Sequence, residues 1–415
     1  MKKNLLKKRK KCRLCNSVKV KQVLSMPSSQ PVDNFRPFFD PEINLPSFDM
    51  DLYQCEKCGH AQLLDIVNPD ILYGNYIYKS SSSPDLKSHF KNYASFLFSH
   101  EYIKKNHKVL DIGSNDGLFL DYLKQRGAVT YGIDPAKTVS DIAKKKGHHI
   151  FNDYLGTSSI KKIKKSFDLI TANNVFSHSD NLQKSLNCIN KLLSKKGTYI
   201  FEVSYLLDTI NNRVIDYIYH EHLSYHSIKS LKPFLKKEKL YIYDVIKVQT
   251  KGGSIRVVCG KNKKNENTAL VNSMIAAEKE KSIYSQNLYN LLSSEISNSR
   301  EIVNRWIESV KKKFSKTQFI GYGACATGTV LTRMMSLDNH LSGFIEDNKD
   351  KHGYLSPNSF LPVVSLESIK NTNNIIIIIL AWRFKDQIIK KIRKKFGKKL
   401  RVISVMPNMT KIVEL

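Results

Sequence analysis

The sequence predicts an α/β protein with two separate sheets behind a small cysteine-rich segment. Strand and helix patterns alternate between residues 108 and 203, and they alternate again from residue 318 onward. This alternation predicts parallel, doubly wound sheets with right-handed crossovers. Two Cys-x-x-Cys pairs lie within the first 80 residues, where helical periodicity is weak. The chain of 415 residues is long enough for three domains, and we expect them at 1–80, 81–262 and 263–415.

Hydrophobic and helical periodicity places the individual elements. In the middle part we expect helices over 85–105, 117–125, 139–146 and 181–193, and strands over 108–112, 129–133, 167–172 and 198–203. A long helical pattern with one break covers 269–312. The last block shows strands over 318–322, 342–346, 375–380 and 400–405, with helices over 328–335 and 384–396. Its Ile375–Leu380 run is typical of a strand buried on both faces.

The composition is that of an ordinary globular protein, with 41% hydrophobic and 25% charged residues, which excludes a fully disordered or fibrous chain. The longest apolar run, Ile375–Trp382, is too short to cross a bilayer, and no apolar segment follows the lysine-rich N-terminus. We therefore expect no membrane span, no signal peptide and a cytoplasmic location. The net charge of +30 leaves an RNA-binding interpretation open, but the lysines are spread over the whole chain and would also suit a small anionic substrate.

Four of the seven cysteines predict a metal site. Cys12 and Cys15 share one tight turn, and Cys55 and Cys58 share another. Two such turns brought together supply four thiolates in a tetrahedron, which fills the coordination of zinc and leaves no position for water. We therefore expect a structural zinc ion, with redox motifs or unrelated pairs as the alternative. The odd number of cysteines also argues for a reducing compartment and against a disulfide framework.

The end of the first strand in the middle part predicts a cofactor site. Val109-Leu-Asp-Ile-Gly-Ser-Asn-Asp-Gly117 closes this strand and opens a helix. Gly113 and Gly117 let the backbone approach a ligand closely, and the carboxylate of Asp111 suits an amino group rather than a phosphate. Asp134 ends the second strand, where an acid can accept both hydroxyls of a ribose.

Two further segments extend this pocket, since Asn152-Asp153 could reach an adenine and 167–176 would close the site. Together these motifs resemble the class I S-adenosylmethionine (SAM) methyltransferases, and a dinucleotide-binding Rossmann domain is the alternative. The resemblance implies SAM as cofactor, bound by Asp111, Gly113, Asn115, Gly117, Asp134, Asp153 and Asn174. No Asn-Pro-Pro-aromatic or Pro-Cys motif follows the fourth strand, which argues against methylation of base amines or of cytosine C5.

Residues 219–226, Tyr-His-Glu-His-Leu-Ser-Tyr-His, are dense in groups that transfer protons. A glutamate that accepts a hydrogen bond from one imidazole nitrogen raises the basicity of the other, as proton abstraction requires. His178 lies beyond the fourth strand, at the carboxyl edge of the sheet, where it would face the methyl donor. A second metal site and a chance cluster of surface residues are the alternatives.

The chain as a whole resembles the three-domain sugar C-methyltransferases, which act on nucleotide-linked 4-keto deoxysugars. The resemblance runs from Cys12 to about Pro407 and includes the cysteine pairs, 72–80, the cofactor loop, 174–178, 218–225, 252–256, 321–328, 347–353 and 380–382. It implies a Rossmann-like class I methyltransferase sheet between an N-terminal zinc-binding module and a second, C-terminal Rossmann-like α/β domain.

The resemblance also implies roles for single residues. Tyr219, Glu221 and His222 would line the sugar site with His222 as the base, and His178 would be a further site histidine. The zinc-binding domain would add a tyrosine, for which Tyr76 and Tyr78 are candidates.

The C-terminal domain would bind the nucleotide diphosphate, with Tyr322, Lys351, Trp382 and Arg383 as expected contacts. The family often has a lysine where this chain has Thr327, and Lys351 or Arg383 would compensate for it.

These roles predict a SAM-dependent C-methyltransferase that works through an enolate. The C-4 ketone acidifies the proton on C-3, His222 removes this proton, and the carbanion attacks the methyl group; Tyr219 and His178 are the candidate donors to the enolate oxygen. Methylation of an oxygen or of another sugar carbon is the first alternative, and an RNA-binding zinc-ribbon methyltransferase is the second. We expect a nucleotide-diphosphate sugar as partner, no nucleic acid and no membrane, and a monomer or homodimer.

Overall fold

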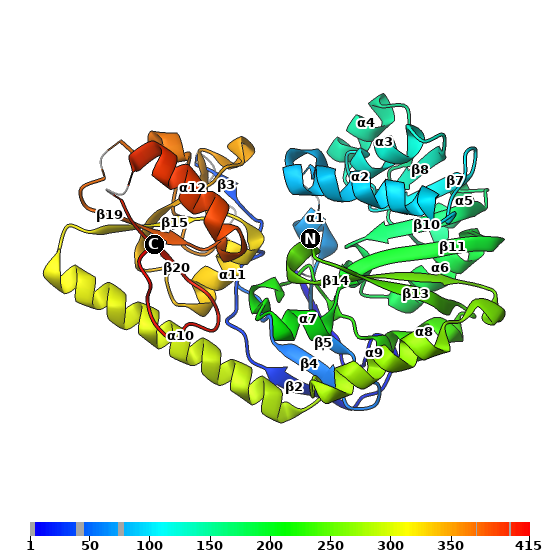
Figure 1. Ribbon diagram of the computed structural model, residues 1–415, viewed down its shortest axis with the longest axis horizontal. Helices are drawn as coiled ribbons and strands as arrows, with labels where there is room; N and C mark the ends of the chain where they lie inside the picture. Colours follow the sequence, from blue (N-terminus) through cyan, green and yellow to red (C-terminus); the bar gives the residue numbers. More distant parts are fainter. Residues whose placement is uncertain (1–4, 39–44, 74–78, 371, 398–399) are drawn as a thin grey trace.

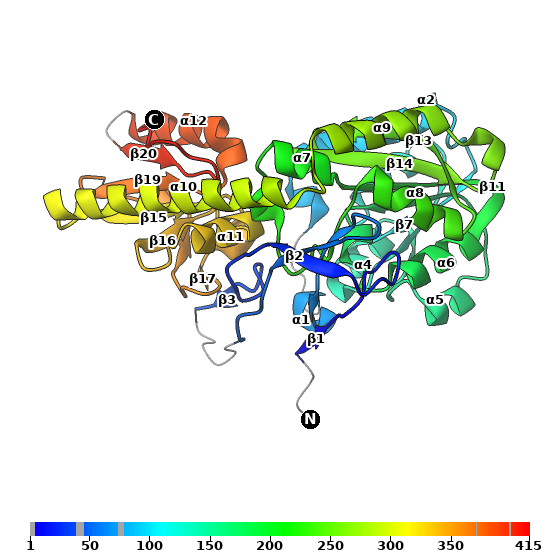
Figure 2. The same ribbon diagram turned by 90° about the horizontal axis from the view of Figure 1, so that it is seen from below.

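The computed structural model describes residues 5–38, 45–73, 79–370, 372–397 and 400–415. They form three parts, each with its own sheet. In Figure 1 the C-terminal part lies on the left and the middle part on the right, with the N-terminal strands between and below them. The long helix α10 (Gln286–Lys313) starts below the N-terminal strands and runs along the underside of the C-terminal part, and Figure 2 shows the same arrangement from below.

The middle part contains a sheet of seven strands, counted over the described residues, in the order β13-β14-β11-β10-β7-β8-β9. The strands are β7 (Lys108–Ile112), β8 (Val129–Ile133), β9 (His149–Phe151), β10 (Phe167–Asn173), β11 (Leu193–Ser204), β13 (Tyr241–Val248) and β14 (Ser254–Gly260). The neighbours from β11 to β9 are parallel. The prediction of a parallel sheet is therefore correct for these five strands, but it does not extend to β14, which runs antiparallel to both neighbours.

Helices cover both faces of this sheet (Figure 1). They are α2 (Pro84–Ser99), α3 (Leu118–Lys124), α4 (Lys137–Lys145), α5 (Thr157–Lys162), α6 (Leu182–Leu192), α7 (Leu206–Asn211), α8 (Ile228–Lys237) and α9 (Thr268–Glu280). The helix predicted to reach residue 105 ends earlier, because Glu101 and Asn106 have φ values of 55° and 68°, which an α-helix does not contain. The predicted break in the long helical pattern is confirmed between α9 and α10, where Ser282 has a φ of 54°.

The C-terminal part is a five-stranded parallel sheet in the order β18-β16-β15-β19-β20. Its elements are β15 (Gln318–Tyr322), α11 (Ala326–Met334), β16 (Leu341–Ile345), β18 (Val363–Val364), β19 (Ile375–Ile379), α12 (Lys385–Phe396) and β20 (Arg401–Ser404). The sequence predicted all of these except the two-residue strand β18, with bounds that differ by at most two residues. The central strand β19 is buried as expected, since Ile377, Ile378 and Ile379 have no exposed surface.

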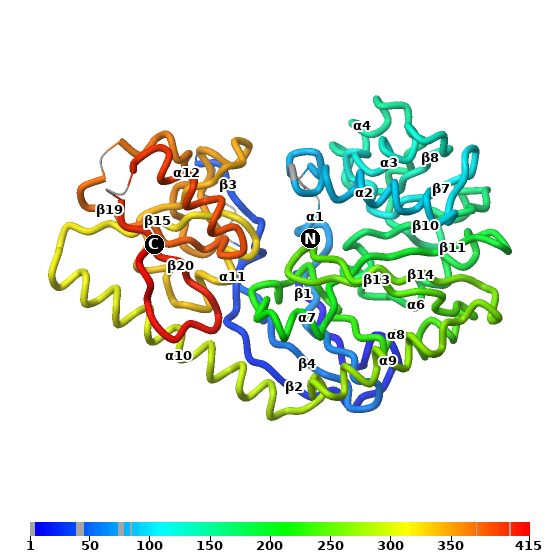
Figure 3. The backbone as a smooth tube through the Cα atoms, viewed as in Figure 1, coloured from blue at the N-terminus to red at the C-terminus, as the bar shows by residue number. Residues whose placement is uncertain are grey.

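The N-terminal segment pairs with both other parts. Its antiparallel sheet has the order β12-β5-β4-β2, formed by β2 (Val20–Leu24), β4 (Leu52–Cys55), β5 (Ala61–Leu63) and β12 (Ser224–Tyr225). The strand β12 comes from the middle of the sequence. Two smaller pairs join β1 (Leu6–Lys8) to β6 (Asp65–Val67), and β3 (Arg36–Pro37) to β17 (Tyr354–Leu355) of the C-terminal part. The tube in Figure 3 shows this segment passing between the other two parts.

One hydrophobic cluster connects the three parts. It includes Leu24 and Met50 near the N-terminus, Tyr225 in the middle part, and Ile296 and Met334 further along the chain. The parts therefore pack against one another through apolar side chains as well as through the shared strands. None of the described helices has both the length and the apolar character needed to cross a membrane.

Candidate active site

Four cysteine side chains converge beside the N-terminal sheet. The sulfur atoms of Cys12, Cys15, Cys55 and Cys58 all lie within 4.8 Å of one another. Two of these distances, Cys12–Cys58 and Cys15–Cys55, are 3.6 Å and 3.5 Å. Sulfur atoms bound to one tetrahedral zinc ion at about 2.3 Å are about 3.8 Å apart, so the cluster fits zinc. Because four thiolates fill the coordination of the ion, its role is structural.

Both cysteine turns are closed by a left-handed residue. Gly59 follows the second pair with a φ of 79°, and its N–H donates to the carbonyl of Cys55 at 2.8 Å. Asn16 does the same for the first pair with a φ of 59°, donating to the carbonyl of Cys12 at 3.0 Å. These bonds fold each pair so that both thiols point to one side.

The predicted cofactor loop lies at the carboxyl end of β7. Gly113 and Gly117 have φ values of 70° and 78°, and Asn115 between them has 49°. A Cβ atom added to Gly113 would lie 2.3 Å from the side chain of Val175, which follows β10. The loop and Val175 are therefore in contact, and this contact requires glycine at position 113.

Two acids of this loop region are already hydrogen-bonded inside the protein. Asp134 accepts from the N–H groups of Asn115 and Ala136, both at 2.9 Å, and burial raises its pKa. Asp111 accepts from Thr171 at 2.7 Å and Asn173 at 3.2 Å. Burial raises the pKa of Asp111 to about 7; the charge of Asp134 adds to this rise, and the two hydrogen bonds oppose it. Asp134 thus lies at the loop, whereas Asp111 lies among the strands.

The other predicted cofactor residues lie around this loop. Asn174 has a φ of 57°, and its N–H donates to the carbonyl of Glu202 at 2.8 Å. Asp153 forms an ion pair with Lys162 at 2.9 Å. The 3-10 helix at Ser80–Ser82 closes on the loop, because the N–H of Ser80 donates to the side chain of Asn115 at 2.9 Å.

Three predicted site residues form a buried group, which we call the histidine cluster (His178, Tyr219 and His222). The ring centroids of His178 and His222 are 5.2 Å apart, and those of Tyr219 and His222 are 4.1 Å apart. His178 ends the 3-10 helix Phe176–His178, which directly follows Asn174 and Val175. The cluster therefore adjoins the predicted cofactor loop.

The hydrogen bond of His222 sets its tautomer. Its Nδ1 lies 2.8 Å from the carbonyl oxygen of Tyr217, and because a carbonyl only accepts, Nδ1 carries the proton. The Nε2 atom therefore has a free lone pair. Burial lowers the pKa of His222 to about 3, and the charge of Lys251 adds to this effect. The imidazole is neutral at physiological pH, which is the protonation state of a base.

Glu221 does not orient His222 as the sequence analysis expected, since Tyr217 supplies the acceptor for Nδ1. Glu221 is itself buried, with 6% of its surface exposed. Burial raises its pKa to about 8; the neighbouring charge of Asp33 raises it further, and Lys251 and Lys351 oppose the shift. A carboxyl group with this pKa is largely protonated at neutral pH and can donate a hydrogen bond.

The remaining histidines of the Tyr219–His226 segment point elsewhere. His220 lies with Nε2 3.2 Å from the carbonyl oxygen of Phe48. The ring of His226 packs 5.5 Å from that of His60 and 5.8 Å from that of Phe176. Only Ser224 and Tyr225 within this segment are strand residues, and the turn before them separates the side chains.

The residues predicted to bind the nucleotide lie at contacts between the parts. Arg383 donates to both carboxylate oxygens of Asp216, at 2.9 and 3.0 Å, and Trp382 donates to the same carboxylate at 3.1 Å. Lys351 forms an ion pair with Asp33 at 3.1 Å. Asp216 lies three residues before Tyr219, so the C-terminal part holds the chain next to the histidine cluster.

Of the three predicted tyrosine contacts, the structure describes only Tyr322, which lies away from the histidine cluster. Tyr322 is 2% exposed in the core of the C-terminal sheet and donates to Asp347 at 2.9 Å. Tyr76 and Tyr78 lie outside the described residues. Tyr73 is a site residue that no sequence pattern indicated. It ends α1 (Pro69–Tyr73), and its ring stacks on His178 with a centroid distance of 6.1 Å.

Lys251 is a second residue that the sequence analysis missed. It lies in the 3-10 turn Thr250–Gly252 with a left-handed φ of 56°. Its charge lowers the pKa of both His178 and His222 and acts against the burial of Glu221. No hydrogen bond or ion pair of its ammonium group is found among the described residues. The available signal was its position directly before the Gly252–Arg256 motif.

Three family models match consecutive stretches of the chain: a zinc binding domain at residues 12–73, a methyltransferase domain at 87–243, and a C-methyltransferase C-terminal domain at 249–407. The chain belongs to the three-domain C-methyltransferases. It is therefore a SAM-dependent enzyme, and its cysteine cluster holds the zinc ion of the N-terminal domain.

Known proteins that are similar to this C-methyltransferase align with different shares of its chain. The C-methyltransferase NovU of Streptomyces niveus is 26% identical over 383 residues, which cover 91% of each chain. A ubiquinone biosynthesis O-methyltransferase of Pelagibacter ubique is 30% identical over 118 residues, 28% of this chain and 47% of that protein. A SAM-dependent methyltransferase structure from Clostridium acetobutylicum has a TM-score of 0.34 and 14% identity, covering 41% of this chain and 91% of that one.

Proposed function

We propose that this C-methyltransferase methylates C-3 of a nucleotide-linked 4-keto deoxysugar. The observation that carries the proposal is the neutral, buried imidazole of His222, whose free Nε2 lies in a cluster next to the cofactor loop. Transfer of a methyl group to carbon requires the loss of a C–H proton, and a carbon beside a ketone is acidic enough for a positioned base to remove that proton.

The cofactor loop would hold SAM, which supplies an electrophilic methyl group. Asp134 would accept the ribose hydroxyls, since its two backbone hydrogen bonds fix the carboxylate and leave further lone pairs. Gly113 and Gly117 would allow close approach of the backbone, and Asn115, Asp153 and Asn174 would line the site. Asp111 would act from inside the sheet by holding Thr171 and Asn173 in place.

In the first step, His222 Nε2 takes the C-3 proton while Nδ1–H remains bonded to Tyr217. A pKa near 3 makes the free imidazole a weak base. The enolate that forms beside it favours the imidazolium, because an adjacent negative charge raises the pKa of the ring. Proton transfer therefore becomes favourable only when the substrate supplies that charge.

The enolate oxygen needs donors or a cation. Tyr219 lies against His222, and His178 has a buried Nε2 without a hydrogen-bond partner among the described atoms. Lys251, whose charge acts on both His178 and His222, would supply a positive charge, and the protonated Glu221 would add a donor. The carbanion at C-3 then attacks the methyl group in line, and no metal takes part.

The nucleotide diphosphate would lie at the start of α11. The turn before this helix has Gly323 at a φ of 117°, and a Cβ atom on Gly328 would lie 2.1 Å from the carbonyl oxygen of Gly323. Such a turn presents backbone N–H groups to an anion. Thr327 lies in the first helical turn, and Lys351 and Arg383 would contribute charge from beside it.

The experiment is a screen of dTDP-, GDP-, CDP- and UDP-linked 4-keto-6-deoxyhexoses for thermal stabilisation and for turnover with SAM, with an RNA oligonucleotide as comparison. The hit is then placed in D₂O with a SAM analogue that cannot transfer its methyl group, and exchange of the C-3 proton is followed by NMR. Exchange at C-3 supports the proposal. Turnover without exchange would contradict it and favour methylation of oxygen.

A further inference from the structure

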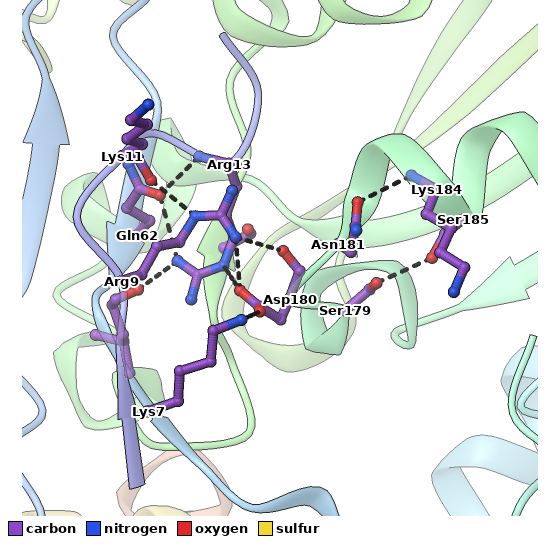
Figure 4. Close-up of polar contacts among 12 residues, drawn as sticks. Lys7, Arg9, Lys11, Arg13, Gln62, Ser179, Asp180, Asn181, Lys184 and Ser185 are labelled. Carbon is purple, nitrogen blue, oxygen red and sulfur yellow. Dashed lines mark hydrogen bonds and ion pairs between the residues drawn. The ribbon is translucent and has the colours of Figure 1, made fainter. Parts of the chain in front are cut away.

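Three basic side chains of the N-terminal segment converge on a single carboxylate, that of Asp180 (Figure 4). Lys7 binds one carboxylate oxygen at 2.8 Å, and Arg9 binds the other at 2.9 Å. Arg9 also donates to the backbone carbonyl of Asp180 at 3.2 Å. The guanidinium of Arg13 lies 3.5 Å from the same carboxylate. We call these four residues the Asp180 clamp.

The clamp begins inside the zinc site. Arg13 stands between the ligands Cys12 and Cys15, and its side chain has no exposed surface. It is fixed by Gln62, which accepts from its backbone N–H at 3.1 Å and from its guanidinium at 3.2 Å, and by the carbonyl of Leu63. The position of this guanidinium therefore follows from the folded zinc turn.

The clamp ends on the loop that carries His178. Asp180 is two residues beyond His178 and directly precedes Asn181, which caps α6 by accepting from the N–H of Lys184 at 3.1 Å. Ser179 bonds to Ser185 on the same helix at 2.9 Å (Figure 4). The loop is thus held by α6 on one side and by the zinc-binding segment on the other.

His178 itself has few polar restraints. Its Nε2 is buried without a hydrogen-bond partner among the atoms described, and its ring lies between those of Tyr73 and His222. Stacking restrains the tilt of the His178 ring, but it does not fix the position of the ring along the faces of its neighbours. The height of His178 relative to His222 is set by the backbone of its loop.

We propose that Asp180 is a positioning residue, which transmits the geometry of the zinc turn to His178 through the Asp180 clamp. The inference rests on the proposed function for its effect on turnover, but its effect on His178 does not. The zinc ion would then have a second role besides folding the N-terminal segment. It fixes the turn that carries Arg13, and Arg13 in turn fixes the loop that carries His178 and Asp180.

The charges around Asp180 favour the ion pairs of the Asp180 clamp at neutral pH. Burial alone would raise the pKa of Asp180, but the hydrogen bond from Lys7 and the charges of Arg13 and Arg9 lower it. The carboxylate is therefore ionised at neutral pH.

The test uses Asp180→Asn in the full chain, since asparagine keeps the shape and the backbone carbonyl contact but removes the charge. The matched control is Asp338→Asn, because Asp338 forms a comparable ion pair with Arg333 at 3.1 Å in the C-terminal part. The measurements are zinc content, SAM affinity by calorimetry, and the ¹⁵N signals of labelled histidines. The His178 signals are assigned by their loss in His178→Gln.

We expect Asp180→Asn to keep one zinc per chain and to bind SAM as the wild type does. The His178 signals should shift most, those of its ring neighbour His222 less, and those of the histidines outside the cluster not at all. With the nucleotide sugar that the wild type turns over, kcat should fall about ten- to hundredfold, as for removal of an outer-shell partner, with a smaller change in KM. Asp338→Asn should change neither His178 nor kcat.

Unchanged His178 signals in a zinc-loaded Asp180→Asn protein would overturn the proposal, and so would an equal loss of kcat in Asp338→Asn. If Asp180→Asn does not fold, Arg9→Gln replaces it, because the side chain of Arg9 is 19% exposed and Lys7 and Arg13 remain in place. Absence of turnover on every nucleotide sugar would contradict the proposed function only, since the NMR signals still test the clamp.

Discussion

The Nδ1 atom of His222 lies 2.8 Å from the carbonyl oxygen of Tyr217, a residue of the same turn. A backbone carbonyl cannot lose or gain a proton near neutral pH, so it fixes the tautomer at every pH at which the protein is folded. A carboxylate in its place would instead raise the basicity of the ring. This enzyme therefore leaves the base weak until its substrate is bound.

Replacement of the base tests this arrangement. In His222→Asn the basic lone pair of Nε2 is lost, and turnover should fall about 10²–10⁴-fold, which is the usual contribution of a general base. SAM affinity should stay unchanged. His220→Asn is the matched control, because His220 belongs to the same motif but contacts Phe48. An equal loss in both variants would show that the segment only maintains the fold.

Lys251→Met should lower kcat with little effect on SAM affinity, since the enolate would lose its cation. Lys251→Arg should retain more activity than Lys251→Met because it keeps the charge. Removal of the charge should also raise the pKa of His222, given that Lys251 lowers it. Histidine titration followed by NMR measures this shift, and a lower pKa in Lys251→Met would refute the electrostatic assignment.

Asp134→Ala should weaken SAM binding at least about tenfold, because hydrogen bonds to a charged group contribute about 1.5–3 kcal/mol each. Isothermal calorimetry gives the affinity. Asp141→Ala serves as control, since Asp141 lies on α4 and forms exposed ion pairs with Lys137 and Lys144. Equal affinity in wild type and Asp134→Ala would mean that another residue binds the ribose.

Metal analysis should find one zinc per chain. Cys55→Ser should release the ion and lower the melting temperature, because the fourth thiolate completes the site. Cys188→Ser, a change at a buried cysteine of α6, should leave the zinc content unchanged. Full zinc retention by a protein with both Cys12 and Cys15 changed to serine would place the ion elsewhere.

Stability should fall as the pH drops from about 7 to about 5. Burial lowers the pKa of His220, His222 and His226 to about 4, 3 and 3. Below the ordinary pKa of about 6.5 the unfolded chain therefore binds protons that the folded chain does not, which favours unfolding. Each such histidine accounts for a loss of about 2 kcal/mol at pH 5.

Urea unfolding at both pH values measures this slope, and His226→Phe isolates one contribution. Both ring nitrogens of His226 are buried without hydrogen-bond partners in the described chain, and the ring packs against Phe176. The variant should be as stable as the wild type or more stable, with a smaller dependence on pH. An unchanged slope would contradict the assignment to His226.

Most helices and strands could be predicted from local hydrophobic patterns in the sequence. Elements that depend on partners far away in the sequence could not. The strands 108–112 and 129–133 were predicted with their observed bounds. The strand β19 was predicted to within one residue, because a strand buried on both faces is a continuous apolar run. The strand β12 was not predictable, since two residues carry no periodicity and its partner β5 lies far away in the sequence. The end of α2 depends on the left-handed Glu101, a residue type that gives no such signal.

The same distinction applies to the candidate site. The cysteine pairs lie in short motifs, and the structure brings all four sulfur atoms together. The partner of His222 could not be read from the sequence, because a backbone carbonyl leaves no residue-type signal and Glu221 was the obvious neighbour. Lys251 was equally hidden, since one lysine among many in a strongly basic chain is not distinctive.

The pairing of β12 with β5 has a consequence for biosynthesis. The strands β2, β4 and β5, which lie beside the four cysteines, are made before β12, so the edge of their sheet is covered only when Ser224 and Tyr225 have been made. Until then this edge offers unpaired backbone groups to other chains. A nascent chain that acquires zinc early would keep the four-cysteine fold together during this interval, so zinc starvation should increase aggregation of newly made protein more than it harms the finished enzyme.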